Sequence, residues 1–356
     1  MARKRAVIAV VSAILLTLYP LAAPASPSNR SSNVLRVAGS IAPLAGIAQQ
    51  VGGDYVNAST LFPEGLDPHA SQLPQDVVNA ANAADLLVLT GHFPWETDLI
   101  NQTGKPFVSL EDSSAIARYE DYGATLSAMP GTGEGNQTSQ EEQNANPHGY
   151  WLLPRNAIAI ANATRAALGM LNFTMSSIWN ANFRGFVGDV QGFEDLVAVR
   201  NSQYHFSSMR AIVVAAEEAY VAETFGIICD AVLQVENVFI SPGELLTVQD
   251  ALRNGTIQLI LGSDVSRLET GGEFAYQLVQ DYGGTLIWWN TVSFSGFADY
   301  VAMMSYNLGV LVSALEHGAA SNSSGVTNLV LIMMSGLLSV VAIIETAVLI
   351  QRAKHE

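Results

Sequence analysis

A histidine of this chain follows a segment that two prolines make stiff. The segment, residues 61–69 (LFPEGLDPH), contains Pro63 and Pro68, and each proline fixes its own φ angle and restricts the preceding residue. It presents His69, with Asp67 two residues earlier. A neutral imidazole held in place is a common ligand of divalent metals, and a nearby carboxylate can orient its second ring nitrogen. The alternative is an ordinary surface histidine, so other residues must decide between the two interpretations.

Other side chains that can bind a metal follow predicted strands. Apolar runs bounded by turn residues predict strands at 55–61, 85–90, 211–216, 257–262 and 285–289. Open α/β sheets bind ligands beyond the carboxyl ends of their strands. The polar residues at those ends are, in order, His69, His92, Glu217 with Glu218, Asp264 and Asn290, and His148 opens the helix after a polar loop. Imidazoles with carboxylate oxygens suit zinc, manganese or iron(II).

Strands and helices alternate along the chain, which predicts an α/β fold with parallel sheets. The segment 174–204 lacks proline and carries apolar residues at helical spacing, although glycines weaken it. We therefore expect two lobes, at 34–172 and 206–317, joined by one long rigid helix at 173–205. The polar segment 131–146 within the first lobe is expected to be a surface loop.

The composition limits the classes of function. Only 13% of the 356 residues are charged and 49% are hydrophobic, so the chain can form cores. Its formal net charge of -16 argues against binding nucleic acid, whose phosphates it would repel. The single cysteine, Cys229, cannot form an internal disulfide bond.

Both ends of the chain resemble membrane-targeting segments. Residues 1–25 combine a basic start, an apolar stretch and small residues, as in a signal peptide; the alternative is an uncleaved anchor. Residues 326–350 are almost wholly apolar and long enough for a transmembrane helix. A tether at 318–325 precedes this span and a basic cytoplasmic tail at 351–356 follows it. The sequence thus predicts a single-pass cell-membrane protein with an extracellular ligand-binding domain.

Sequons for N-glycosylation support an extracellular position for the domain. All precede the predicted span, at Asn29, Asn57, Asn101, Asn136, Asn162, Asn172, Asn254 and Asn322. An anchored glycoprotein without disulfides fits an archaeal cell surface.

The chain resembles the metal-binding subunits of ABC importers for zinc and manganese. The resemblance covers about residues 37–315 and is carried by LFPEGLDPHASQLPQD, NAADLLVLTGHFPWE, PHGYWLLPRNAIAIANATRAAL, AYVAETFGI, SPGELLTVQDALRNG and DYVAMMSYNLGVLVSAL. It implies two α/β lobes bridged by a rigid helix, with a divalent cation between them. It also implies delivery of that cation, as cargo, to a permease with its ATPase in the same membrane.

The family's ligands transfer only in part. His69 and His148 match the first two family histidines. The third ligand, usually a histidine, falls on Ala215 without a gap or on Glu217 after a shift of two, so Glu217 or Glu218 is expected to replace it. The fourth, commonly an aspartate, falls on Asn290. A carboxylate in place of an imidazole would harden the site, which favours manganese or iron over zinc.

The expected function is capture of Zn²⁺ or Mn²⁺ by a monomeric solute-binding protein for ABC-type import. The alternative is a cell-surface protein of the same fold with a degenerate metal site, acting in adhesion or binding another ligand. An enzyme is not expected, because no HExxH or GxSxG motif is present. His92, beside Phe93 and Trp95, is interpreted as part of the cleft wall.

Overall fold

The structure, a computed structural model, describes residues 34–63, 69, 73–131, 145–236, 238–293, 297 and 299–317. Several predicted features lie outside these residues. They are the signal peptide, the tether, the transmembrane span and the cytoplasmic tail, and also Asp67 of the segment 61–69. None of the described helices is both long and apolar enough to cross a membrane.

The N-terminal lobe is built on a five-stranded parallel sheet with the order β2-β1-β3-β4-β5. Its strands are β1 (Leu35–Gly39), β2 (Val56–Thr60), β3 (Leu86–Val88), β4 (Phe107–Ser109) and β5 (Ala117–Arg118). Residues of β3 and β4 are all buried, as expected of parallel strands covered on both faces. Because β2 and β3 flank β1, the loops that follow them leave the same edge of the sheet.

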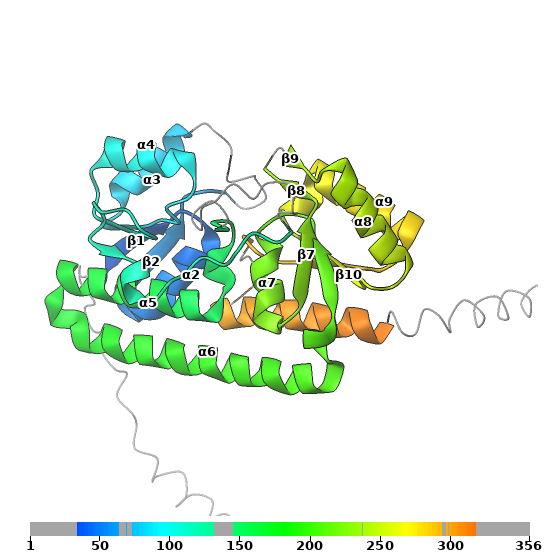
Figure 1. Ribbon diagram of the computed structural model, residues 1–356. Coiled ribbons are helices and arrows are strands. Elements are labelled where there is room, and N and C mark those ends of the chain that lie inside the picture. Colours follow the sequence, from blue (N-terminus) through cyan, green and yellow to red (C-terminus); the bar gives the residue numbers. More distant parts are fainter. Residues whose placement is uncertain are drawn as a thin grey trace, which may run out of the picture. The chain divides into compact units, whose positions relative to one another are not determined.

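Helices cover both faces of this sheet (Figure 1). They are α2 (Ala42–Gly52), α3 (Gln75–Ala83), α4 (Pro94–Thr103) and α5 (Pro154–Leu171). Three of them, α2, α4 and α5, have a proline as their first or second residue, which suits the first turn because its missing N–H would have no partner there. Figure 1 places α3 and α4 on one face and α5 on the other.

A single long helix, α6 (Ser176–Tyr204), follows the N-terminal lobe. Its buried side chains recur at helical spacing, at Trp179, Phe186, Val190, Phe193 and Val197. It packs on α2 and α5 along its first part, and its last part borders Phe225 of the next lobe. The long connecting helix expected from the sequence is therefore present.

The C-terminal lobe has a four-stranded parallel sheet with the order β11-β10-β6-β7. The strands are β6 (Arg210–Val213), β7 (Ile228–Val232), β10 (Leu259–Ser263) and β11 (Thr285–Trp289), and β8 (Gln234–Val235) forms a small antiparallel pair with β9 (Val238–Phe239). The helices are α7 (Glu218–Phe225), α8 (Pro242–Arg253) and α9 (Thr270–Tyr282). A final helix at 300–317 ends the described chain. The α/β class, the parallel sheets and the two lobes are confirmed.

One hydrophobic core joins the two lobes. The largest cluster of buried side chains contains Val37 and Leu87 of the N-terminal lobe together with Phe225 and Trp289 of the C-terminal lobe. Met303 of the final helix belongs to the same cluster. A second, smaller cluster around Ile212, Ile260 and other residues lies within the C-terminal lobe.

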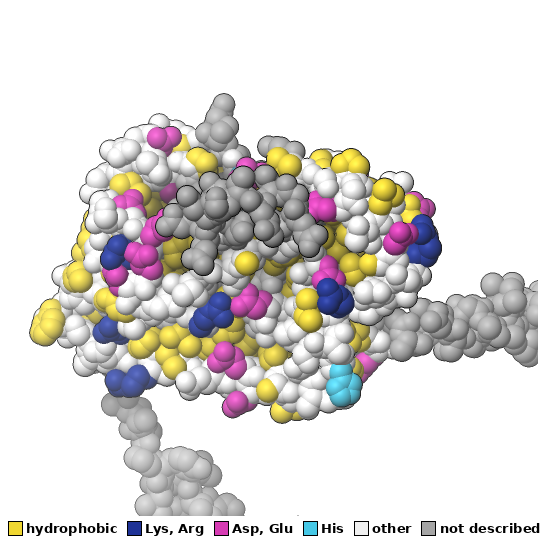
Figure 2. Space-filling view, in the orientation of Figure 1, with side chains coloured by type: hydrophobic (Ala, Val, Ile, Leu, Met, Phe, Trp, Pro, Cys, Tyr) yellow, Lys and Arg dark blue, Asp and Glu magenta, His cyan; other side chains and the backbone are white. Residues whose placement is uncertain are grey.

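Acidic side chains are scattered over the face of the molecule that Figure 2 draws. On the face drawn in Figure 2, Asp and Glu side chains are scattered among Lys and Arg side chains instead of forming one acidic patch.

Candidate metal centre

Three histidine side chains meet in the structure. The Nε2 atoms of His69 and His92 lie 3.2 Å apart, and His92 Nε2 lies 3.1 Å from Nδ1 of His148. One ring nitrogen of each residue lies within 4.8 Å of the other two. Nitrogens this close can bind one ion, because zinc–imidazole bonds are about 2.0–2.1 Å long. Among the described residues, no other group of three His, Cys, Asp or Glu side chains meets this spacing.

A buried carboxylate holds the loop that carries His92. Glu96, at the start of α4, accepts hydrogen bonds from the backbone N–H groups of Thr90 and Gly91, both at 2.8 Å, and of His92 at 3.2 Å. The Thr90 hydroxyl also donates to this carboxylate. Glu96 is 2% exposed, and burial raises the pKa of its carboxyl group. The loop after β3 is therefore fixed from within the protein.

The loop of His148 is fixed by an asparagine and a glycine. The backbone N–H of His148 donates to Oδ1 of Asn146 at 3.0 Å. Gly149 follows with a φ of +83°, a conformation that L side chains rarely adopt. A Cβ at Gly149 would lie 2.7 Å from Cα of Glu217, so only glycine lets this loop approach the C-terminal lobe so closely.

The C-terminal lobe brings Glu217 to the same cavity. Its Oε1 accepts a hydrogen bond from the Ser263 hydroxyl at 3.1 Å. Glu218 faces a different environment, because its carboxylate accepts from the backbone N–H of Ala215 at 2.7 Å and from the Ser266 hydroxyl at 2.6 Å. Glu218 is fully buried and does not line the cavity, and its role as a ligand stays a prediction.

The cavity has a volume of about 440 Å³ and receives side chains from both lobes. Its lining includes the three histidines, the aromatic residues Phe93 and Trp151, and the carboxylates of Glu217 and Glu269. The His69 ring packs edge-on against Phe93, with 5.2 Å between the ring centres. Aromatic walls exclude water, which strengthens the attraction between an ion and its ligands.

Burial keeps the imidazoles of His92 and His148 neutral. It lowers the pKa of His92 to about 4, with a smaller contribution from His69, and the pKa of His148 to about 3, with contributions from His92 and His69. Neutral rings have the free lone pair that a metal ligand requires. Burial also raises the pKa of Glu217 to about 7, and the nearby carboxylate of Glu269 adds to this effect.

The position expected for the family's fourth ligand has another role in this structure. Asn290 is bonded through its backbone N–H and C=O to the side chain of Asn307, and it does not line the cavity. Asp264 accepts hydrogen bonds from the backbone N–H groups of Thr291 and Ser293, which ties the loop after β11. Ala215, the ungapped position of the third ligand, lines the cavity but has no donor atom in its side chain.

The sequence placed His92 among the possible ligands at the strand ends, but we interpreted it as a residue of the cleft wall. The aromatic residues beside it favoured the interpretation as a wall residue, and it does line the cavity. The structure also brings its Nε2 to 3.2 Å from Nε2 of His69 and to 3.1 Å from Nδ1 of His148. The signal was present, because His92 follows a predicted strand at the same edge of the sheet as His69.

The sequence profile of the family described as zinc-uptake complex component A, periplasmic (ZnuA) matches residues 37–314. The match covers more than half of the chain. The chain belongs to this family. ZnuA-family proteins are extracytoplasmic solute-binding proteins of metal transport and not a family of enzymes.

Solved structures share the fold of this ZnuA-family chain. The protein FpvC of Pseudomonas aeruginosa in complex with Mn²⁺ has 20% sequence identity and a TM-score of 0.63, covering 80% of this chain and 99% of its own. A Mn-bound periplasmic metal-binding protein from Candidatus Liberibacter asiaticus has 18% identity and a TM-score of 0.60, covering 79% and 99%. A zinc-bound ZnuA deletion mutant has 18% identity and a TM-score of 0.60, covering 77% and 95%.

Proposed function

We propose that this chain captures a divalent metal ion, Zn²⁺ or Mn²⁺, between its two lobes and delivers it to an ABC permease in the same membrane. The observation that carries the proposal is the cluster of His69, His92 and His148, whose ring nitrogens lie within 4.8 Å of one another. Family membership supports it, as do structures of similar fold in complex with manganese and with zinc.

In this proposal three imidazoles supply one side of the coordination sphere. His69 and His92 come from loops at the carboxyl edge of the N-terminal sheet, and His148 comes from the segment before α5. Burial keeps His92 and His148 neutral, so the ion does not compete with protons on these two residues near pH 7.

Glu217 supplies the ligand from the C-terminal lobe. Its side chain is half-buried, and its carboxylate lines the cavity and accepts a hydrogen bond from Ser263, as a metal-binding carboxylate does from its supporting residues. Three nitrogens and one oxygen complete a tetrahedral zinc site, and additional water oxygens would suit manganese. The charge of the carboxylate also compensates part of the charge of the cation.

The proposal includes the membrane. The apolar span at 326–350 would anchor a monomeric binding protein at the outer face, beside the permease that receives the ion. The tether at 318–325 follows directly on the final described helix, and it would let the two lobes reach that partner.

Calorimetric titration of the metal-free protein with Zn²⁺ and with Mn²⁺ tests the proposal. The expected result is one ion per chain, with micromolar or tighter affinity that is lost in His69→Ala and in His148→Ala. Binding that is indifferent to both substitutions would contradict it. Absence of binding would favour a surface protein of the same fold with a degenerate site.

A further inference from the structure

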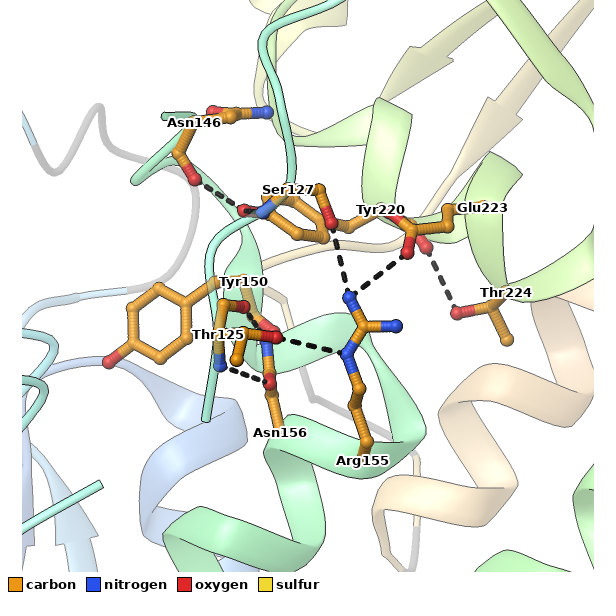
Figure 3. A network of polar contacts seen from close by, with 9 residues as sticks. All are labelled: Thr125, Ser127, Asn146, Tyr150, Arg155, Asn156, Tyr220, Glu223 and Thr224. Atoms are coloured by element: carbon orange, nitrogen blue, oxygen red, sulfur yellow. Dashed lines mark hydrogen bonds and ion pairs between the residues drawn. The ribbon is translucent and has the colours of Figure 1, made fainter. Parts of the chain in front are cut away.

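The loop of His148 is attached to the C-terminal lobe as well as to its own. Figure 3 shows this region, where the segments around Ser127 and Asn146 meet Tyr220 of α7. Asn146 connects the two lobes here, because its side chain and its backbone both have hydrogen-bond partners in the C-terminal lobe. Asn146 is 1% exposed, so each of its polar atoms must be satisfied within the protein.

The side chain of Asn146 is hydrogen-bonded to one backbone group in each lobe. Its Oδ1 accepts from the backbone N–H of His148 at 3.0 Å, and its Nδ2 donates to the backbone carbonyl of Ala216 at 2.8 Å. The orientation of the amide is fixed by these partners, since an N–H group can only donate and a carbonyl can only accept. One side chain thus connects the backbone of a candidate ligand to the residue that precedes Glu217.

The backbone of Asn146 has a second connection to the same lobe. The Tyr220 hydroxyl donates to the carbonyl of Asn146 and accepts from the backbone N–H of Ser127 at 3.0 Å. The close approach of Gly149 to Glu217 is a third contact along this segment. The segment 146–149 therefore lies directly on the residues that begin α7.

The other polar link in this region contributes less. Arg155 pairs with Glu223 at 3.1 Å and donates to Thr125 and Ser127 (Figure 3). The side chains of Arg155 and Glu223 are 51% and 38% exposed, so water and salt screen this ion pair. The buried bonds of Asn146 are the ones whose loss leaves unsatisfied groups.

We propose that Asn146 is a positioning residue that holds His148 in the histidine cluster by anchoring its loop to the C-terminal lobe. Without the amide, the N–H of His148 and the carbonyl of Ala216 lose their partners, and the His148 ring is free to leave its contact with His92. The consequence for metal affinity rests on the proposed function, whereas the placement of the ring does not.

A matched pair of variants of the full chain tests this role. Asn146→Ala removes both bonds, whereas Asn156→Ala removes an equally buried amide whose bonds to Thr125 and Tyr150 stay within the N-terminal lobe. Nuclear magnetic resonance of the ¹⁵N-labelled imidazoles in the metal-free protein reports whether His148 Nδ1 keeps its bond to His92. Urea unfolding of both variants shows whether each remains folded.

We expect the His148 ring signals to move toward those of a solvated imidazole in Asn146→Ala and to stay unchanged in Asn156→Ala. Metal affinity should fall about tenfold in the first variant alone, as the loss of one buried hydrogen-bonding group predicts. Unchanged ring signals in Asn146→Ala, or the same shift in both variants, would overturn the inference. Wild-type protein that binds neither ion would refute the proposed function, and the ring signals would still decide the role of Asn146.

Discussion

The proposed metal site depends on three imidazoles that lie against one another, those of His69, His92 and His148. His92 is central, because its Nε2 contacts both His69 and His148. Burial lowers the pKa values of His92 and His148 far below their ordinary value, so these two rings are uncharged near pH 7. A cation that enters between the rings gains their lone pairs without first displacing protons from these two residues.

Removal of His92 should weaken metal binding as strongly as removal of either neighbouring histidine. We expect His92→Ala to lose more than about 100-fold in affinity, since loss even of a group that only supports a ligand costs about 10–100-fold. His317→Ala, at the exposed end of the final helix, is the control and should bind normally. Calorimetry measures both. Equal affinities of the two variants would show that His92 only lines the cavity.

The pH dependence of binding should reveal Glu217. Its pKa is raised to about 7, so below pH 7 a metal must displace its proton, and affinity should fall as the pH is lowered from 8 to 6. His92 and His148, with pKa values of about 4 and 3, add no dependence in this range. Glu217→Gln should bind more weakly and with a shallower pH profile. An identical profile in the variant would exclude the Glu217 carboxylate as a ligand.

At the scale of elements, tertiary packing stabilises a helix whose sequence has only a weak intrinsic preference for the helical conformation. Helix α6 contains Gly185, Gly188 and Gly192, which disfavour a helix, yet the helix spans Ser176–Tyr204 without a break. It is stabilised by the buried side chains on its inner face, such as Phe186 and Val190. Because these buried side chains recur at helical spacing, the sequence could predict helix α6 despite its glycines.

Replacing these three glycines by alanine should stabilise the protein. All three are exposed, and a Cβ at each would meet nothing within 4 Å, so each substitution should add about 0.5–1 kcal/mol to the free energy of unfolding. Gly104→Ala is the matched control and should lower the free energy of unfolding, because Gly104 follows the last residue of α4 with a φ of +58°, which alanine adopts only with strain. Urea unfolding measures both. A triple variant less stable than the wild type would contradict this account of α6.

The sequence predicts more of the strands than of the short connections. Strands such as β3 and β10 are buried on both faces and appear as continuous apolar runs, so they could be located within a few residues. The start of helix α8 at Pro242 is set by a local cap, because the Ser241 hydroxyl accepts a hydrogen bond from the backbone N–H of Glu244 in its first turn. The pair of β8 and β9 was not predicted, since two-residue strands leave no periodic pattern.

At the scale of the molecule, the site forms where two lobes meet, and this limits prediction from sequence. The rule that ligands bind at the carboxyl ends of strands predicted that His69 and His92 lie at one edge of the N-terminal sheet. It predicted Glu217 at the corresponding edge of the C-terminal sheet. It could not give the distance between lobes, which depends on close contacts such as that of Gly149 with Glu217. The sequence could match Asn290 to the family's fourth ligand position, but it could not show where that residue lies. In the structure the backbone of Asn290 is hydrogen-bonded to the side chain of Asn307, away from the cavity.

The most direct test of the central claim is anomalous diffraction from crystals of the metal-loaded protein. We predict a single strong peak about 2.0–2.3 Å from one ring nitrogen of each of His69, His92 and His148, on the side that faces Glu217. A peak elsewhere in the molecule, or crystals from metal-saturated solution with no peak at these three histidines, would contradict the proposal that they bind the ion.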